Sequence, residues 1–205
     1  MLDAALQQLP LVAILRGVKP DQVEAIADAL YIEGFRVIEV PLNSPNALES
    51  IARLARRMPE DVVLGAGTVL SVEAVAQVQA SGGKLIVMPH ADVAVIREAK
   101  ARGLYCVPGA ATPTEAFAAI NAGADALKLF PAEFVTPAVV KAMRAVLPKT
   151  LRLLPVGGIT PDNMAPYVEA GAAGFGLGSA LYSPGLNAAE VGRRAHAFAQ
   201  AWHSL

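Results

Sequence analysis

The sequence predicts an α/β domain in which eight strand–helix units close into a (β/α)8 barrel, or TIM barrel, and three observations indicate it. First, short apolar runs rich in β-branched residues recur, with an alanine-rich amphipathic segment after each. Second, successive runs begin about 20 to 27 residues apart, which is long enough for a crossover helix and too long for a hairpin. Third, no flexible linker divides the 205 residues, so 1–205 are expected to form a single domain.

Eight apolar runs are the predicted strands, and each ends near a turn-forming residue. In order they are LVAILR from Leu11, FRVIEVPL from Phe35, VVLGAGTV from Val62, KLIVMP from Lys84, LYCVPG from Leu104, ALKLFP from Ala126, LRLLPV from Leu151 and GFGLGS from Gly174. The turn after the first run lacks the GxGxxG pattern of dinucleotide-binding sheets. An open, doubly wound sheet is therefore the weaker prediction.

The segments between these runs carry helix start and stop signals. The residues from Thr112 to Glu115 read as a capping box with proline at the first helical position. The cap-then-proline pair recurs at Thr136-Pro137 and Thr160-Pro161. Glycines that follow the amphipathic segments predict their ends: Gly34, Gly103, Gly123 and Gly171. The segment before Pro10 is predicted to be a short helix that covers the bottom of the barrel.

Composition excludes several classes of function. The chain is 54% hydrophobic and 17% charged, with a formal net charge of -1, so no long-range field favours nucleic acid or an acidic membrane. The single cysteine, Cys106, can form neither a disulfide framework nor a cysteine zinc site. No signal peptide pattern and no apolar stretch of about 20 residues is present. We therefore expect a cytoplasmic protein, with any phosphate bound locally.

Two charged residues lie where the strand pattern predicts apolar ones. In the sixth run, Lys128 shares a face with Ala126 and Phe130, so it points into the barrel if the alternating leucines pack on helices. Glu39 is predicted to point inward in the same way from the second run. A structural reading makes them a buried ion pair or a snorkelling lysine. The functional reading makes Lys128 an amine nucleophile and Glu39 the group that moves protons.

A nucleophilic lysine needs a lowered pKa, because an ordinary lysine near 10.4 is only about 0.1% neutral near pH 7.4. Arg16, at the end of the first run, is a cation that could lower the pKa of Lys128. Arg16 could equally bind a substrate carboxylate or form a salt bridge at the rim. Thr68 follows a Gly-Ala-Gly segment and could orient a carboxylate, or merely cap the next helix, although Ser71 is better placed for that.

Glycine clusters at the ends of the last two runs predict a phosphate site. Gly157-Gly158 and Gly178-Ser179 lie where barrel enzymes commonly bind phosphate through backbone N–H groups. Ordinary turn glycines are the alternative. His90 follows the fourth run and reads more readily as a solvated loop residue than as a substrate contact. No metal-ligand spacing occurs, so neither a bound metal nor a cofactor is expected.

Taken together, the segments LVAILRG, VIEVPLNSP, GAGTVL, ALKLFPAE, PVGGITPDN and GLGSALY resemble the 2-keto-3-deoxy-6-phosphogluconate and -galactonate aldolases, nearly end to end. The resemblance implies a homotrimeric barrel lyase whose substrate is a phosphorylated keto acid. It implies that Lys128 is the Schiff-base lysine and Glu39 the general acid/base. By position, Arg16 and Thr68 match residues that hold the pyruvate-like end, while the glycines and Ser179 match the phosphate site.

Two positions separate the substrate types within that family. This chain has Asn43 where the gluconate enzymes look to have arginine, and Val156 where they look to have threonine, so it resembles the galactonate type. The expected reaction is cleavage of 2-dehydro-3-deoxy-6-phospho-D-galactonate to pyruvate and D-glyceraldehyde 3-phosphate. The alternatives are the same reaction on the C4 epimer, a non-covalent phosphosugar epimerase or isomerase, and a phosphosugar-binding protein without turnover.

Overall fold

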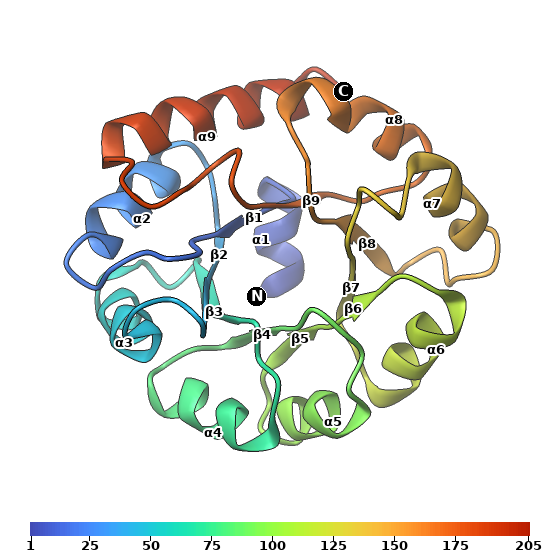
Figure 1. Cartoon of the computed structure of the whole chain (residues 1–205), viewed down its shortest axis with the longest axis horizontal. Coiled ribbons are helices and arrows are strands. Elements are labelled where there is room, and N and C mark those ends of the chain that lie inside the picture. The colour runs from blue at the N-terminus through green and yellow to red at the C-terminus, as the bar shows by residue number, and fades with distance from the viewer.

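The computed structural model describes residues Met1–Leu205 and consists of nine helices and nine strands in near-strict alternation. Figure 1 shows an inner ring of strands, an outer ring of helices, and α1 at the centre. The strands are β1 Leu11–Ile14, β2 Val37–Pro41, β3 Val63–Gly67, β4 Leu85–Val87, β5 Tyr105–Val107, β6 Gly109–Ala110, β7 Ala126–Leu129, β8 Arg152–Pro155 and β9 Phe175–Leu177. The helices are α1 Leu2–Gln8, α2 Val23–Ile32, α3 Ala47–Arg57, α4 Val72–Ala80, α5 Val93–Ala101, α6 Pro113–Ala122, α7 Pro137–Arg144, α8 Met164–Glu169 and α9 Ala188–His203, with a 3-10 turn η1 Pro161–Asn163 before α8.

All strand pairs are parallel, and the strands curl around a common centre in two hydrogen-bonded sheets. One sheet has the order β5-β4-β3-β2-β1-β9 and the other the order β6-β7-β8. On one side a single bridge joins Val156 to Gly176. On the other side the amide of Asp125, just before β7, donates to the carbonyl of Cys106 in β5 at 2.9 Å. The predicted α/β class is confirmed, whereas the hydrogen-bond ladder is interrupted rather than continuous.

The predicted runs all contain a strand, but the fifth run is divided. Pro108 separates β5 from β6, and proline has no N–H to donate to a ladder. Strand β5 pairs with β4, while β6 pairs with β7. The carbonyl of Pro108 still accepts from the amide of Lys128 at 2.9 Å. The chain thus passes from the first sheet to the second at this proline, which accounts for one of the two breaks between the sheets; the other lies between β8 and β9.

The predicted helix signals lie at helix ends. Thr112 and Glu115 form a capping box at the start of α6, and Gly123 ends that helix in the left-handed conformation with φ 102°. Thr160 forms a second box with Asn163, which opens η1 rather than an α-helix. Thr136 precedes α7 but its side chain makes no capping hydrogen bond. The chain therefore follows the predicted boundaries even where one predicted capping bond is missing.

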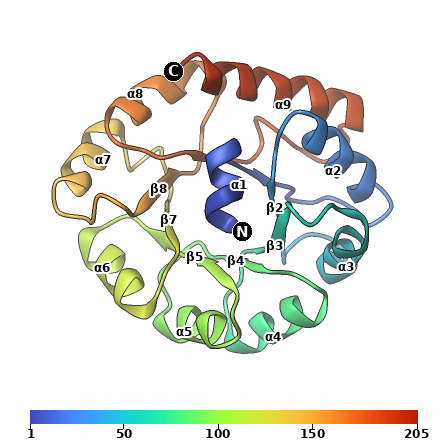
Figure 2. The ribbon, with the colours of Figure 1, turned by 180° about the vertical axis from the view of Figure 1, so that it is seen from behind.

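Helix α1 covers one end of the ring of strands, as predicted. Its buried residues Leu2, Ala5 and Leu6 belong to a cluster of 11 buried residues whose other members lie on β1 to β5, β7 and β8. The full set, here called the bottom cluster, is Leu2, Ala5, Leu6, Val12, Val37, Val63, Leu85, Val87, Val107, Ala126 and Leu154. Figure 2, from the side opposite to Figure 1, shows α1 across the middle of the ring. The amino ends of the strands are therefore closed to solvent.

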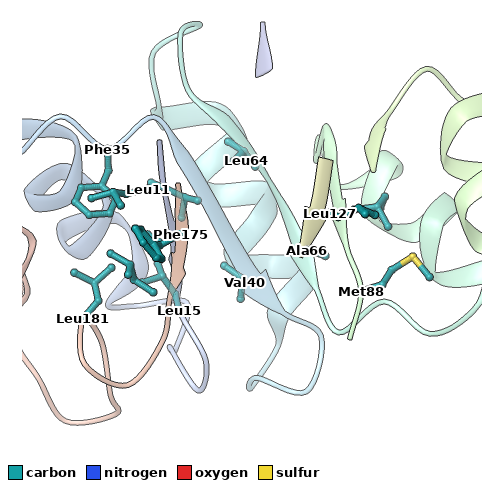
Figure 3. Packing of buried hydrophobic residues seen from close by; sticks show 14 of the residues in the cluster. Leu11, Leu15, Phe35, Val40, Leu64, Ala66, Met88, Leu127, Phe175 and Leu181 are labelled. Atoms are coloured by element: carbon teal, nitrogen blue, oxygen red, sulfur yellow. The ribbon is translucent and has the colours of Figure 1, made fainter. Parts of the chain in front are cut away.

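The larger core lies between the strands and the outer helices and contains 53 buried residues. Figure 3 shows Leu11, Leu15, Phe35, Phe175 and Leu181 gathered on one side of this layer. Residues that alternate with these along the strands face the centre instead, because successive strand side chains point to opposite faces. No helix is both long and apolar enough to cross a membrane.

Candidate functional site

Lys128 and Glu39 both face the centre of the ring, as predicted. Leu127 and Leu129, on either side of Lys128, belong to the outer core. Lys128 is 6% exposed and Glu39 is 1% exposed. Both line a small cavity of about 20 Å³ whose other walls are almost entirely apolar and include Leu6 of α1. The site therefore has a dry floor directly beneath two ionisable groups.

Burial changes the proton affinity of both groups. It raises the pKa of Glu39 to about 7, although the charges of Lys128 and Arg16 oppose this change. It lowers the pKa of Lys128, an effect that Glu39 opposes and Arg16 reinforces. Both shifts favour the uncharged form, because a low-dielectric site disfavours charge. An uncharged amine can attack a carbonyl, and a carboxyl that titrates near neutral pH can both donate and accept protons.

The predicted alternative of a structural ion pair between these groups does not describe the structure. The Oε2 atom of Glu39 is buried and has no hydrogen-bond partner. The Nζ atom of Lys128 lies 4.6 Å from the centre of the Phe130 ring, in a cation–π arrangement. A buried carboxylate oxygen without a donor is costly. The arrangement leaves both groups available to a bound molecule.

The Gly-Ala-Gly segment of β3 makes room for this arrangement. A Cβ atom on Gly67 would overlap the carboxylate of Glu39, and one on Gly65 would overlap the backbone of Leu85. The prediction that small residues here permit the close approach of a neighbouring side chain is confirmed. Only glycine at position 67 allows Glu39 its observed place.

Thr68 follows directly, with a positive φ of 54°, which is uncommon for a β-branched residue. It is partly buried, and its side chain makes no hydrogen bond within the chain. The capping role belongs to Ser71, whose hydroxyl accepts from the amide of Ala74 at 3.2 Å. The strained backbone thus presents a hydroxyl that has no structural partner.

Arg16 extends from the end of β1 and is exposed to solvent. Its guanidinium donates to the Oδ1 atom of Asn43 at 2.8 Å, and it pairs with no carboxylate. The predicted alternative of a rim salt bridge is therefore wrong. The amide contact orients Arg16 without neutralising its charge, which explains why Arg16 still acts on the pKa values of Glu39 and Lys128.

A cleft of about 400 Å³ lies at the carboxyl ends of β7, β8, β9 and β1 and is here called the substrate cleft. Seven predicted site residues line it together: Arg16, Lys128, Val156, Gly157, Gly158, Gly178 and Ser179. Three others lie outside its lining. Glu39 borders the cavity beneath, Asn43 contacts Arg16, and Thr68 follows Gly67. His90 is exposed and also lies outside the lining, in agreement with its interpretation as a loop residue.

The far end of the cleft is formed by backbone rather than by cationic side chains. Gly157 and Gly158 have φ values of 114° and 61°, a conformation that favours glycine. Gly178 begins a short helical turn, because its carbonyl accepts from the amides of Leu181 and Tyr182, each at 2.9 Å. Arg194 of α9 donates to the carbonyl of Ser179 at 3.2 Å. Such turns present N–H groups to an anion.

The cleft also contains residues that the sequence analysis did not select: Phe130, Glu133 and Thr160. Thr160 was interpreted only as a helix cap, and Phe130 only as a neighbour of Lys128. Glu133 carried the stronger signal, because it is a carboxylate a few residues beyond the end of a strand, where chemistry collects in barrels. The structure contains no group of three or more His, Cys, Asp or Glu side chains that could hold a metal ion.

Known proteins resemble this chain over nearly its whole length. The family model for KDPG and KHG aldolase matches residues 2–197. The chain is 45% identical to the probable 2-dehydro-3-deoxy-6-phosphogalactonate aldolase of Rhizobium meliloti (strain 1021), over 96% of this chain and 92% of that protein. It is 44% identical to the 2-dehydro-3-deoxy-6-phosphogalactonate aldolase of Escherichia coli (strain K12), over 95% of each.

The solved structures agree with the sequence comparison. The "Native KDPGal structure" superposes with a TM-score of 0.94 at 44% sequence identity, and the match covers 96% of each chain. The likeness therefore extends over nearly the whole ring of strands and helices. On the strength of the matching family model and of these near full-length relatives, the chain belongs to the KDPG and KHG aldolase family.

Proposed function

We propose that this protein is a class I aldolase, a lyase that cleaves 2-dehydro-3-deoxy-6-phospho-D-galactonate to pyruvate and D-glyceraldehyde 3-phosphate. The observation that carries the proposal is the buried pair of Lys128 and Glu39 beside the substrate cleft. Burial lowers the pKa of the Lys128 amine and raises that of the Glu39 carboxyl to about 7, which are the directions that Schiff-base chemistry needs. The relatives' names agree with this reaction.

In this mechanism the neutral amine of Lys128 attacks the C2 ketone of the substrate and forms a carbinolamine. Loss of water gives an iminium ion, which accepts the electron pair of the C3–C4 bond when that bond breaks. The C4 hydroxyl loses its proton, and the aldehyde product leaves. Protonation of the resulting enamine at C3 and addition of water then release pyruvate and restore Lys128. Glu39, whose pKa near 7 suits both directions of transfer, moves these protons.

The two ends of the substrate need different partners. We assign the carboxylate end to Arg16, held by Asn43, and to the unpartnered hydroxyl of Thr68. We assign the phosphate to the backbone N–H groups of Gly157, Gly158 and Gly178 and to Ser179. This places the reacting carbons above Lys128 and Glu39, with the sugar chain along the cleft.

Val156 is the residue we assign to the choice between C4 epimers. It lines both the cleft and the cavity beneath it, and it lies against Gly176, where a Cβ atom would contact its side chain. A methyl group there offers no hydrogen bond to a sugar hydroxyl, unlike a threonine hydroxyl. An unsatisfied polar group costs roughly 1 to 3 kcal/mol, so cleavage of the gluconate epimer is expected to be slower and not absent. Kinetics on both epimers, for the wild type and Val156→Thr, measure this preference.

The Schiff base has a direct test. Borohydride added with pyruvate should reduce the imine and attach a three-carbon acid to Lys128, which peptide mass spectrometry locates. No adduct at Lys128 would contradict the mechanism and favour a non-covalent isomerase or a binding protein. Borohydride without pyruvate is the control.

We also propose that residues 1–205 act as one domain whose two sheets form a single closed (β/α)8 barrel. The bridge from Val156 to Gly176 and the hydrogen bonds across Pro108 support closure.

We further propose that the protein is a homotrimer and is located in the cytoplasm. Exposed apolar side chains, among them Leu70 at 55% and Phe134 at 68%, are candidates for subunit contacts. The chain also resembles a protein cage "designed by fusing symmetric oligomeric domains", covering 73% of that chain. Light scattering in solution measures the mass.

A further inference from the structure

Glu133 is held over the substrate cleft by its backbone neighbours. The amide of Ala132 donates to the carbonyl of Val156 at 2.9 Å, just beyond the end of β8. The carbonyl of Ala132 accepts from the hydroxyl of Tyr167 in α8, also at 2.9 Å. The amides of Phe134 and Val135 both return to the carbonyl of Pro131. Hydrogen bonds on both sides of Glu133 therefore fix the backbone of this turn, from which the Glu133 side chain extends.

The carboxylate of Glu133 lies against the double glycine assigned to phosphate. A Cβ atom on Gly157 would overlap Oε2 of Glu133, and one on Gly158 would come 3.2 Å from Oε1. The side chain is exposed to the cleft, and no group in the chain donates a hydrogen bond to it or forms an ion pair with it. It is thus a free acceptor inside the substrate cleft.

This position is unfavourable for phosphate alone. A carboxylate accepts hydrogen bonds only, so it repels a phosphate dianion nearby and offers it nothing. It suits a hydroxyl group next to the phosphate, because a charged acceptor forms a stronger hydrogen bond than a neutral one. With the ketone carbon at Lys128 and the phosphate at the glycines, the hydroxyl nearest to Gly157 is the one on C5, beside the phosphate-bearing carbon.

We infer that Glu133 is a specificity-determining residue that accepts a hydrogen bond from the C5 hydroxyl of the substrate. The inference rests on the proposed aldolase function and extends it to the middle of the sugar chain. Glu133 favours phosphorylated compounds that carry this hydroxyl and disfavours free phosphate and phosphate esters that lack it. The residue takes no part in the bond-breaking step.

The test runs the reaction in the direction of addition, with pyruvate and one of two aldehydes. D-Glyceraldehyde 3-phosphate carries the hydroxyl in question, and 3-oxopropyl phosphate lacks it. The wild type should prefer the first aldehyde by about tenfold or more in kcat/KM, the ratio expected for one hydrogen bond to a charged acceptor. Glu133→Ala should lose most of this preference. Inorganic phosphate, used as a competitive inhibitor, should bind several-fold more tightly to that variant because a repelling charge is gone.

Glu133→Gln keeps the shape and an acceptor oxygen while removing the charge, so it should retain part of the preference and still show tighter phosphate inhibition. Glu60→Ala is the matched control, since it removes an exposed carboxylate from a loop outside the cleft. An unchanged preference, an equal loss for both aldehydes, or unchanged phosphate inhibition in Glu133→Ala would overturn the inference. Borohydride trapping of pyruvate on Lys128 is measured in every protein. Loss of trapping in the wild type would instead contradict the proposed function.

Discussion

The two ends of the same strands differ sharply in chemistry. At the amino ends, Val37 of β2 and Ala126 of β7 belong to the dry bottom cluster under α1. Two residues further along, on the same inward face, stand Glu39 and Lys128. On each of these strands, the apolar residue of the bottom cluster and the ionisable residue of the site are therefore only two positions apart.

The bottom cluster influences the pKa values of the ionisable groups above it. The cavity of about 20 Å³ is shared between apolar members of the bottom cluster and the two ionisable groups. Water is thereby kept from one side of Lys128 and Glu39, and desolvation is the largest cause of the shift in both pKa values. The open cleft lies on the other side of the two groups. Stability and reactivity are thus assigned to opposite ends of one lumen.

The largest expected effect comes from replacing an ionisable residue above the bottom cluster by an apolar one. Lys128→Met removes the amine and keeps most of the volume. Cleavage should fall by at least about a thousandfold, because no nucleophile remains. The free energy of unfolding, from urea denaturation, should hold or rise, because a buried ionisable group is replaced by an apolar one. A variant that kept substantial activity would show that Lys128 is not the nucleophile.

The second prediction concerns a substitution that weakens the packing of the bottom cluster. Leu6→Ala removes a buried side chain of α1, which is 2% exposed, and should lower the free energy of unfolding by about 2 to 5 kcal/mol. Urea denaturation monitored by circular dichroism measures the loss. Pyruvate trapping on Lys128 should persist in the folded fraction. A loss below about 1 kcal/mol would mean that α1 contributes little to closing the strands.

The third expected effect depends on pH and concerns Glu39, which borders the cavity that it shares with the bottom cluster. The pKa of Glu39 in the folded chain is about 7, above its ordinary value of 4.5, so the folded state holds this proton more tightly than the unfolded chain does. The free energy of unfolding should therefore decrease as the pH rises from about 4.5 to 7, with the full penalty present above 7.

Glu39→Gln removes this penalty. The variant should be more stable than the wild type at pH 8, by about 3 kcal/mol, and by less than about 1 kcal/mol at pH 5. Urea denaturation at both pH values gives the comparison. In the wild type, kcat/KM should rise as the pH passes through about 7 and Glu39 loses its proton, and the variant should lack this rise. A stability difference that is the same at pH 5 and pH 8 would show that Glu39 is not the titrating group.

The order of the strands and helices could be predicted from the sequence, because each secondary-structure signal is local. Apolar runs, Thr112 with Glu115, and Gly123 depend only on neighbours a few residues away. The inward orientation of the Lys128 and Glu39 side chains could be predicted from the two-residue repeat of a strand. The division at Pro108 did not follow, because a proline can lie within or beside a strand, and its effect depends on which neighbour each half pairs with.

The sequence by itself determined the eight units, the inward lysine and glutamate, and the glycines of the last two strands. Only the tertiary structure decided what lies across the lumen: that Glu39 fills the space left by Gly67, that Arg16 pairs with Asn43 and no carboxylate, and that Glu133 stands over Gly157. The physical reason is range. Strand and helix signals act within one turn or one pleat, whereas these contacts join strand ends and loops far apart in sequence, and only closure of the ring brings them together.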